Sequence, residues 1–161
     1  MLVAFNSLPD HARVWIYPSN RPFLEEEIEP LQSRIKEFLS QWTAHNQVLE
    51  ASFELPYKRF IVIGLNQEVV QASGCSIDAS VRFIQELEKQ FEVVLLDKMN
   101  VTFKQGNFLA HKPLQDFVKM AKAKSISKET VVFNNLVDNM ADYKQFWEVP
   151  AGESWHHRFI K

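Results

Sequence analysis

The segment of this chain best suited to chemistry is a glycine-containing loop that leads into an amphipathic helix. Its sequence is S-G-C-S-I-D-A-S, from Ser73 to Ser80. Backbone N–H groups at the start of a helix are unpaired, and the helix dipole favours an anion there. We therefore predict a ligand-binding site with these candidate residues: Ser73, Gly74, Cys75, Ser76, Asp78, Ser80 and Arg82.

Cys75 is the candidate nucleophile of this loop, because a helix N-terminus stabilises a thiolate. A Cys–His pair would require His45, His111 or a histidine of the C-terminal tail to approach Cys75. A phosphatase-type loop has five residues between its nucleophilic cysteine and its arginine. Six residues separate Cys75 from Arg82, so a phosphatase reaction at this loop is excluded.

The same loop also has a purely structural interpretation. Ser76 would then be the N-cap of the helix, and Asp78 in the first turn would complement the helix dipole. Gly74 would form a tight turn and Cys75 would pack as a small side chain. The sequence leaves both interpretations open.

Asn134 and Asn135 follow a predicted strand and are further candidate ligand-binding residues, since amides can fix a polar ligand. Asparagine also favours turns, so the pair equally fits a turn or the start of a helix.

The remaining motifs argue against several classes of site. The five histidines have no metal-ligand spacing, and adjacent His156 and His157 are expected to be exposed polar residues. None of the four glycines is followed by lysine, which excludes a P-loop ATPase, and no G-x-S-x-G is present. We predict no metal and no cofactor, and the absence of these motifs favours a protein that is not an enzyme.

Six segments of the first half have the hydrophobic periodicity of strands and helices. They follow the order strand, helix, strand, strand, helix, strand, at residues 13–17, 24–42, 49–55, 59–65, 77–91 and 93–96. Pro30 should kink or restart the first helix. The order predicts an α+β fold, with an antiparallel sheet covered by helices on one face, in a ferredoxin-like βαββαβ core.

The second half is expected to extend this sheet and to add a helix. Strands are predicted at 99–103, 108–111 and 130–133, with a turn at 105–107 and a helix that opens at Pro113. The aromatic tail must pack on the core or on a partner. We predict one domain over 1–161, with a core at about 12–104 and an extension at about 105–161.

Composition limits the partners and the compartment. The chain has 161 residues and a formal charge of −2, so its lysine-rich segment (Lys112, Lys119, Lys122, Lys124 and Lys128) is interpreted as a solvated face and nucleic acid is not expected. A single cysteine fits a reducing compartment. No apolar run is long enough to span a membrane, so we expect a cytoplasmic protein without a membrane partner.

Four motifs occur together along nearly the whole chain. They are W-T-A-H from Trp42, S-G-C-S-I-D-A-S from Ser73, V-F-N-N-L-V from Val132 and W-E-V-P-A-G-E-S-W-H from Trp147. With these motifs the chain resembles a small family of uncharacterised bacterial proteins, chiefly from Bacteroidetes, which often carry the label "ABC transporter ATPase". The resemblance implies no mechanism, and the missing Walker A lysine does not support that label.

These observations favour a non-enzymatic cytosolic binding or assembly domain that self-associates as a homo-oligomer. The alternative is an anion- or small-ligand-binding protein, or a thiol-dependent enzyme, centred on the loop from Ser73 to Ser80. An accessory protein of a transporter is a third interpretation, suggested by the family label alone.

Overall fold

A computed structural model describes all residues of the chain, 1–161, and confirms the predicted α+β class. The chain divides into two compact units. The first unit contains Met1–Leu96 and Asp138–Ala141, and the second contains Asp97–Val137 and Asp142–Lys161. The boundary between the units lies before the predicted end of the core at residue 104, and the prediction of a single domain remains a prediction.

The first unit is built on a three-stranded antiparallel sheet in the order β1-β5-β4. The strands are β1 (Arg13–Pro18), β4 (Glu50–Glu54) and β5 (Phe60–Asn66). Ile63 at the centre of β5 pairs with Trp15 on one side and Phe53 on the other. All residues of β5 from Phe60 to Leu65 are buried, as expected for a central strand whose two faces are both covered.

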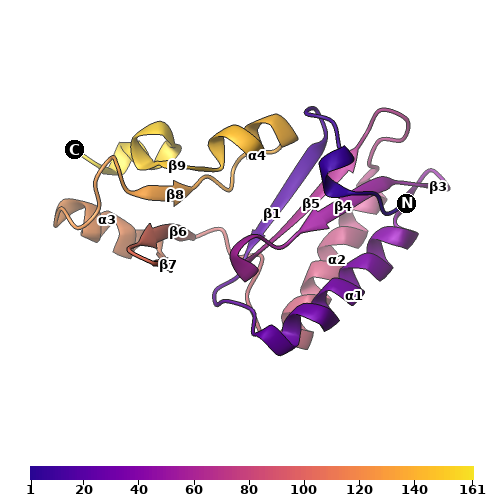
Figure 1. Cartoon of the computed structure of the whole chain (residues 1–161), viewed down its shortest axis with the longest axis horizontal. Helices are drawn as coiled ribbons and strands as arrows, with labels where there is room; N and C mark the ends of the chain where they lie inside the picture. The colour runs from indigo at the N-terminus through magenta and orange to yellow at the C-terminus, as the bar shows by residue number, and fades with distance from the viewer. The chain divides into compact units, whose positions relative to one another are not determined.

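Two helices, α1 (Glu25–Gln41) and α2 (Gly74–Phe91), cover the same face of this sheet (Figure 1). Their apolar side chains recur every three or four residues, so each helix presents one buried stripe. The core between helices and sheet includes Leu31, Ile35, Leu39, Phe83, Ile84, Leu87, Ile61, Ile63 and Leu65.

Gly64 faces the opposite side of the sheet, where other parts of the first unit approach it closely. A Cβ atom built on Gly64 would lie 2.6 Å from Leu8 Cδ1 and 3.4 Å from Met140 Cε. The short 3₁₀ turn at Phe5–Ser7 also contributes Phe5, whose ring would lie 3.7 Å from that atom. A glycine in a central strand often marks such a close approach.

Each edge of the three-stranded sheet forms one short β-bridge with a segment that is distant in sequence. Next to β4, the Ala51 N–H donates to the Met1 carbonyl, and Val3 N–H donates to the Ala51 carbonyl, both at 3.0 Å. Next to β1, the Val14 N–H donates to the Asp138 carbonyl at 2.9 Å, and Met140 N–H donates to the Ala12 carbonyl at 2.9 Å.

The first helix does not restart at Pro30, because α1 is continuous from Glu25 to Gln41. Pro30 is exposed and is the sixth residue of α1, so the helix loses only one backbone bond near its solvated start.

The predicted strand at 93–96 is also absent. The N–H groups of Leu95 and Leu96 donate to Glu88 Oε2 at 2.7 and 3.1 Å, and the Val94 N–H donates to Asn20 Oδ1 at 2.8 Å. These side chains therefore accept the backbone hydrogen bonds that a neighbouring strand would otherwise have accepted. The sheet has three of the four strands expected for a ferredoxin-like core.

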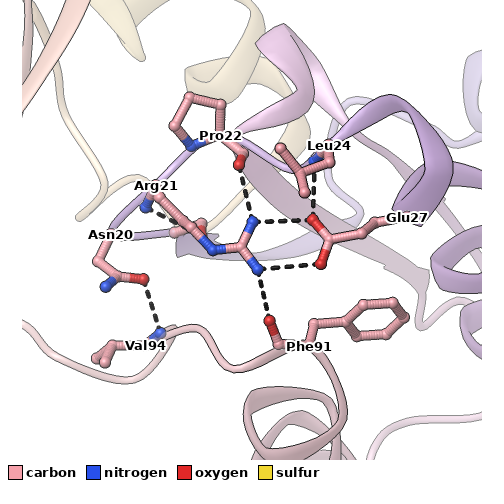
Figure 2. Close-up of polar contacts among 8 residues, drawn as sticks. Asn20, Arg21, Pro22, Leu24, Glu27, Phe91 and Val94 are labelled. Carbon is pink, nitrogen blue, oxygen red and sulfur yellow. Dashed lines mark hydrogen bonds and ion pairs between the residues drawn. The ribbon is translucent and has the colours of Figure 1, made fainter.

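The loop before α1 is tied to the end of α2 through Arg21 (Figure 2). Arg21 Nη1 and Nη2 donate to Glu27 Oε1 and Oε2 at 2.8 and 3.0 Å, and Nη2 also donates to the Phe91 carbonyl at 2.5 Å. Glu27 Oε1 additionally accepts from the Leu24 N–H at 2.8 Å. One guanidinium thus joins the first turn of α1 to the last residue of α2.

Two short connections complete the first unit. The strands β2 (Thr43–Ala44) and β3 (Gln47–Val48) form a hairpin whose turn residues, His45 and Asn46, both have positive φ. That geometry is typical of a type I′ turn. A 3₁₀ turn at Pro56–Lys58 connects β4 to β5.

The second unit has its own four-stranded sheet in the order β7-β6-β8-β9, so the prediction that this half extends the first sheet is wrong. Its strands are β6 (Asn100–Gln105), β7 (Phe108–Pro113), β8 (Val131–Phe133) and β9 (Glu148–Pro150). The predicted hairpin turn between β6 and β7 is confirmed, with Gly106 at φ +63°. The helices are α3 (Leu114–Lys122) and α4 (Met140–Phe146), which begins in the first unit, and 3₁₀ turns follow at Ala151–Glu153 and Trp155–Phe159.

The aromatic tail packs on the core of its own unit. Phe103 and Phe117 pack edge to face with centroids 5.5 Å apart, and His156 packs on Phe117 at 5.5 Å. Trp155 and Phe159 lie against the same cluster, which also contains Val101, Val132 and Ile160. This packing agrees with the prediction that the tail packs on the core or on a partner, although Phe146 is exposed.

Candidate functional site

The loop before α2 is closed by hydrogen bonds between its own serines. Ser73 is the N-cap residue, and its Oγ accepts from the Ser76 N–H at 3.1 Å. Ser76 Oγ in turn accepts from the Ser73 N–H at 2.7 Å and donates to the Ser73 carbonyl at 2.8 Å. This reciprocal arrangement is a capping box with serine in place of the usual glutamate. The predicted N-cap, Ser76, is three residues too late, and Asp78 accordingly lies beyond the first turn.

Two serines of the loop are buried and bonded to the fold. Ser80 Oγ donates to the Ile77 carbonyl at 2.6 Å and is also hydrogen-bonded to Tyr17. Burial raises the pKa of Tyr17 to about 12. The Ser76 carbonyl accepts a hydrogen bond from Trp42 Nε1 at 2.8 Å, which fixes the end of α1 against the start of α2.

The other candidates on α2 are all exposed to solvent: Gly74, Cys75, Asp78 and Arg82. A Cβ atom on Gly74 would meet nothing within 4 Å, so a close packing contact does not explain this glycine. Arg82 does not line the pocket beside Cys75 that is described next.

A surface pocket of about 390 Å³ lies between the end of α1 and the start of α2. It is lined by Phe38, Gln41, Trp42, Thr43, Cys75, Ser76 and Ala79. Its size is within the range of small-molecule sites, and apolar rings with a few polar groups are typical of such sites. The lining contains no Asp, Glu, Lys, Arg or His side chain, so the pocket suits a neutral ligand better than an anion.

Asn134 and Asn135 belong to the second unit, whereas the loop from Ser73 to Ser80 belongs to the first. Asn134 Oδ1 accepts from the Leu136 N–H at 3.1 Å, and Asn135 Oδ1 accepts from Trp147 Nε1 at 2.8 Å. The Asn134 N–H donates to the Trp147 carbonyl at 2.6 Å. These bonds agree with the interpretation of the pair as turn residues.

The prediction that both histidines of the tail are exposed is wrong for His156, which is 1% exposed. Its Nδ1 is 2.8 Å from Ser154 Oγ, its ring stacks on Trp155, and its Nε2 is buried without a hydrogen-bond partner. Burial lowers the pKa of His156 to about 4, so the ring is neutral at neutral pH. The sequence could not predict that His156 is buried, because only the geometry of the 3₁₀ turn distinguishes it from the exposed His157.

The two units carry opposite net charges, a feature that the charge of the whole chain conceals. The first unit has eight Lys and Arg residues against fourteen Asp and Glu residues, a net charge of −6. The second unit has ten against six, a net charge of +4.

Neither a family model nor a curated protein nor a solved structure matches this chain. No group of three or more His, Cys, Asp or Glu side chains is arranged to hold a metal ion. None of the helices combines the length and the apolar character needed to cross a membrane.

Proposed function

We propose that this chain is a non-enzymatic cytosolic binding and assembly domain that associates with further copies of itself. The observation that carries the proposal is the opposite charge of its two compact units, −6 and +4. Complementary charged surfaces on one chain give each copy two different contact surfaces for its neighbours. The near-neutral total charge also limits the repulsion between copies.

The hydrogen bonds of the loop before α2 support a structural role for its serines. Ser73 and Ser76 bond each other, and Ser80 bonds Ile77 and Tyr17. A catalytic serine would instead need its hydroxyl next to a base.

Sedimentation velocity at increasing concentration tests self-association directly. At about 50 mM salt, where the Debye length exceeds 10 Å, the weight-average sedimentation coefficient should rise as the protein is concentrated. A coefficient that stays at the value of an 18.8 kDa monomer across this range would refute the proposal.

The pocket beside Cys75 favours a second function, the binding of a small neutral ligand or a thiol-dependent reaction. Its lining combines two aromatic rings, Phe38 and Trp42, with the exposed thiol of Cys75. A ligand at a hundred times its Kd stabilises a protein by about 2.7 kcal/mol, which raises Tm by roughly 5–10 °C in a domain near this size.

A thermal-shift screen of small neutral aromatic and aliphatic compounds tests this second function. Ala79→Met would fill the pocket and should abolish the shift, whereas Ala123→Met, outside the pocket, should not. Iodoacetamide provides an independent test, because a catalytic thiol should react faster in the folded protein than in a denatured control. Equal rates together with no shift would exclude this function.

We further infer that the chain belongs to the bacterial family that it resembles. The four motifs distributed from Trp42 to His156 support this membership, and a single cysteine supports a reducing cytoplasmic compartment. A role as an accessory of a transporter rests on the family label alone.

A further inference from the structure

The second unit exposes a row of lysines without acidic partners. Lys119 and Lys122 lie on the exposed side of α3, opposite the buried Phe117 and Ala121. Lys124 and Lys128 follow in the exposed turn after the helix. None of the four forms an ion pair in the structure. We call these four residues the basic surface.

The first unit has a corresponding row of glutamates on the solvent side of α1. Glu26, Glu29 and Glu37 are exposed and lie opposite the buried stripe of Leu31, Ile35 and Leu39. None of the three glutamates forms an ion pair either. We call them the acidic surface.

The spacing of the two surfaces is complementary. Glu26 and Glu29 are three residues apart on one helix, and Lys119 and Lys122 are three residues apart on another. Residues at this spacing are neighbours on a helix surface, with Cβ atoms about 5–6 Å apart. Two helices placed side by side can therefore bring both pairs of opposite charges together.

From these observations we propose that the basic surface of one copy binds the acidic surface of a second copy. The inference rests on the self-association proposed above and identifies the surfaces that produce it. Because the two surfaces differ, the contact is head-to-tail and can repeat along a chain of copies or close into a ring.

A second copy fits the basic surface better than a nucleic acid does. The segment from Lys119 to Lys128 contains no arginine and no aromatic residue. Arginine and aromatic rings supply the bidentate and stacking contacts typical of nucleic-acid binding. The charge of −6 on the first unit would also repel a polyanion, whereas it attracts the basic surface of another copy.

Exposed ion pairs are individually weak and are screened by salt, so the association should be weak and salt-sensitive. We expect a Kd on the order of 100 µM at 50 mM NaCl and at least about a tenfold weaker affinity at 500 mM NaCl. Sedimentation velocity at both salt concentrations measures this difference.

Charge reversal separates the proposed contact from other modes of self-association. Lys119→Glu with Lys122→Glu should abolish association, and so should Glu26→Lys with Glu29→Lys. Each reversed variant keeps one native surface, so an equimolar mixture of the two should associate again. Lys98→Glu with Lys161→Glu has the same net charge as the first variant, lies outside the basic surface, and should associate normally. Circular dichroism confirms that every variant is folded.

The outcomes distinguish this inference from the proposed function. Association that persists in both reversed variants would overturn the charged contact while leaving self-association intact. A monomer under all conditions would overturn both. An oligonucleotide labelled with fluorescein tests whether the basic surface binds nucleic acid instead. If it binds the wild type and not the Lys119→Glu, Lys122→Glu variant while no self-association occurs, the basic surface serves nucleic acid and the inference is wrong.

Discussion

Arg21 donates a hydrogen bond to the carbonyl of Phe91, seventy residues away in sequence, and thereby caps the C-terminal end of α2 with a positive charge. The same guanidinium binds both carboxylate oxygens of Glu27 in the first turn of α1. The hydrogen bond from Arg21 is the main cause that lowers the pKa of Glu27. One side chain therefore sets the position of two helix ends, which local sequence preferences leave undetermined.

Replacing Arg21 by methionine should destabilise the fold by about 1–2 kcal/mol, since hydrogen bonds to charged groups are stronger than neutral ones. Urea unfolding measures the change in the free energy of unfolding. Arg34→Met is the matched control, because Arg34 is about as exposed as Arg21 but bonds a much more exposed carboxylate, that of Glu86. Its loss should stay within about 0.5 kcal/mol. Equal losses for the two variants would contradict the role given to Arg21.

Ser73→Ala should destabilise the protein by about 1 kcal/mol, because it removes the side chain that accepts from the Ser76 N–H. Ser73→Asp should retain most of the stability, since aspartate is also a good N-cap residue. Chemical denaturation of the three proteins measures these differences. A loss in Ser73→Ala with no recovery in Ser73→Asp would argue against capping as the function of this serine.

The stability of the protein should depend on pH through His156. Its folded-state pKa, about 4, lies below the usual 6.5, so the folded state favours the neutral ring. The resulting stability is complete above pH 6.5 and is lost as pH falls from 6.5 towards 4, by up to about 3 kcal/mol.

Thermal unfolding at pH 7.5 and pH 5 checks this dependence. His156→Phe should flatten it, whereas His157→Phe, at the exposed neighbouring position, should not. A wild-type Tm that is the same at both pH values would show that His156 is not kept neutral by burial.

Gly64→Ala should destabilise the first unit by about 1–3 kcal/mol, because the new methyl group would lie 2.6 Å from Leu8 Cδ1. Shortening the neighbour provides the control. In the double variant with Leu8→Ala, the cost of the alanine at position 64 should be smaller than in the wild-type background. Free energies of unfolding for all four proteins form a double-mutant cycle, and additive losses would contradict the contact.

Hydrophobic periodicity was sufficient to predict the α+β class, both long helices and the central strand. It failed at Val93–Leu96, an apolar run of strand length that buries Val93 and Leu95 without being a strand. The side chains of Val93 and Leu95 pack in the core, while the side chains of Glu88 and Asn20 accept hydrogen bonds from the backbone N–H groups of this run. The apolar run itself predicts burial, but it does not predict that Glu88 and Asn20 accept hydrogen bonds from its backbone.

For the loop from Ser73 to Ser80, the sequence correctly predicted the start of a helix but assigned the wrong N-cap residue. Ser73 and Ser76 both favour an N-cap, and only the folded backbone shows that Ser73 caps while Ser76 completes the box. The pocket beside Cys75 was not predicted, because it requires Phe38 and Trp42 from the end of α1. The charge difference between the units could have been counted from the sequence, but only once the unit boundaries were known.

The segment Asp138–Ala141 that forms a bridge with the edge of β1 has a consequence for biosynthesis. More than a hundred residues separate it from Val14, its hydrogen-bonding partner in that strand. While the chain leaves the ribosome, the edge of β1 beside Arg13 lacks this partner until residues 138–141 have been made. The nascent chain therefore exposes an unpaired strand edge to which a chaperone can bind. On ribosomes stalled before residue 138, the first unit should be incompletely folded.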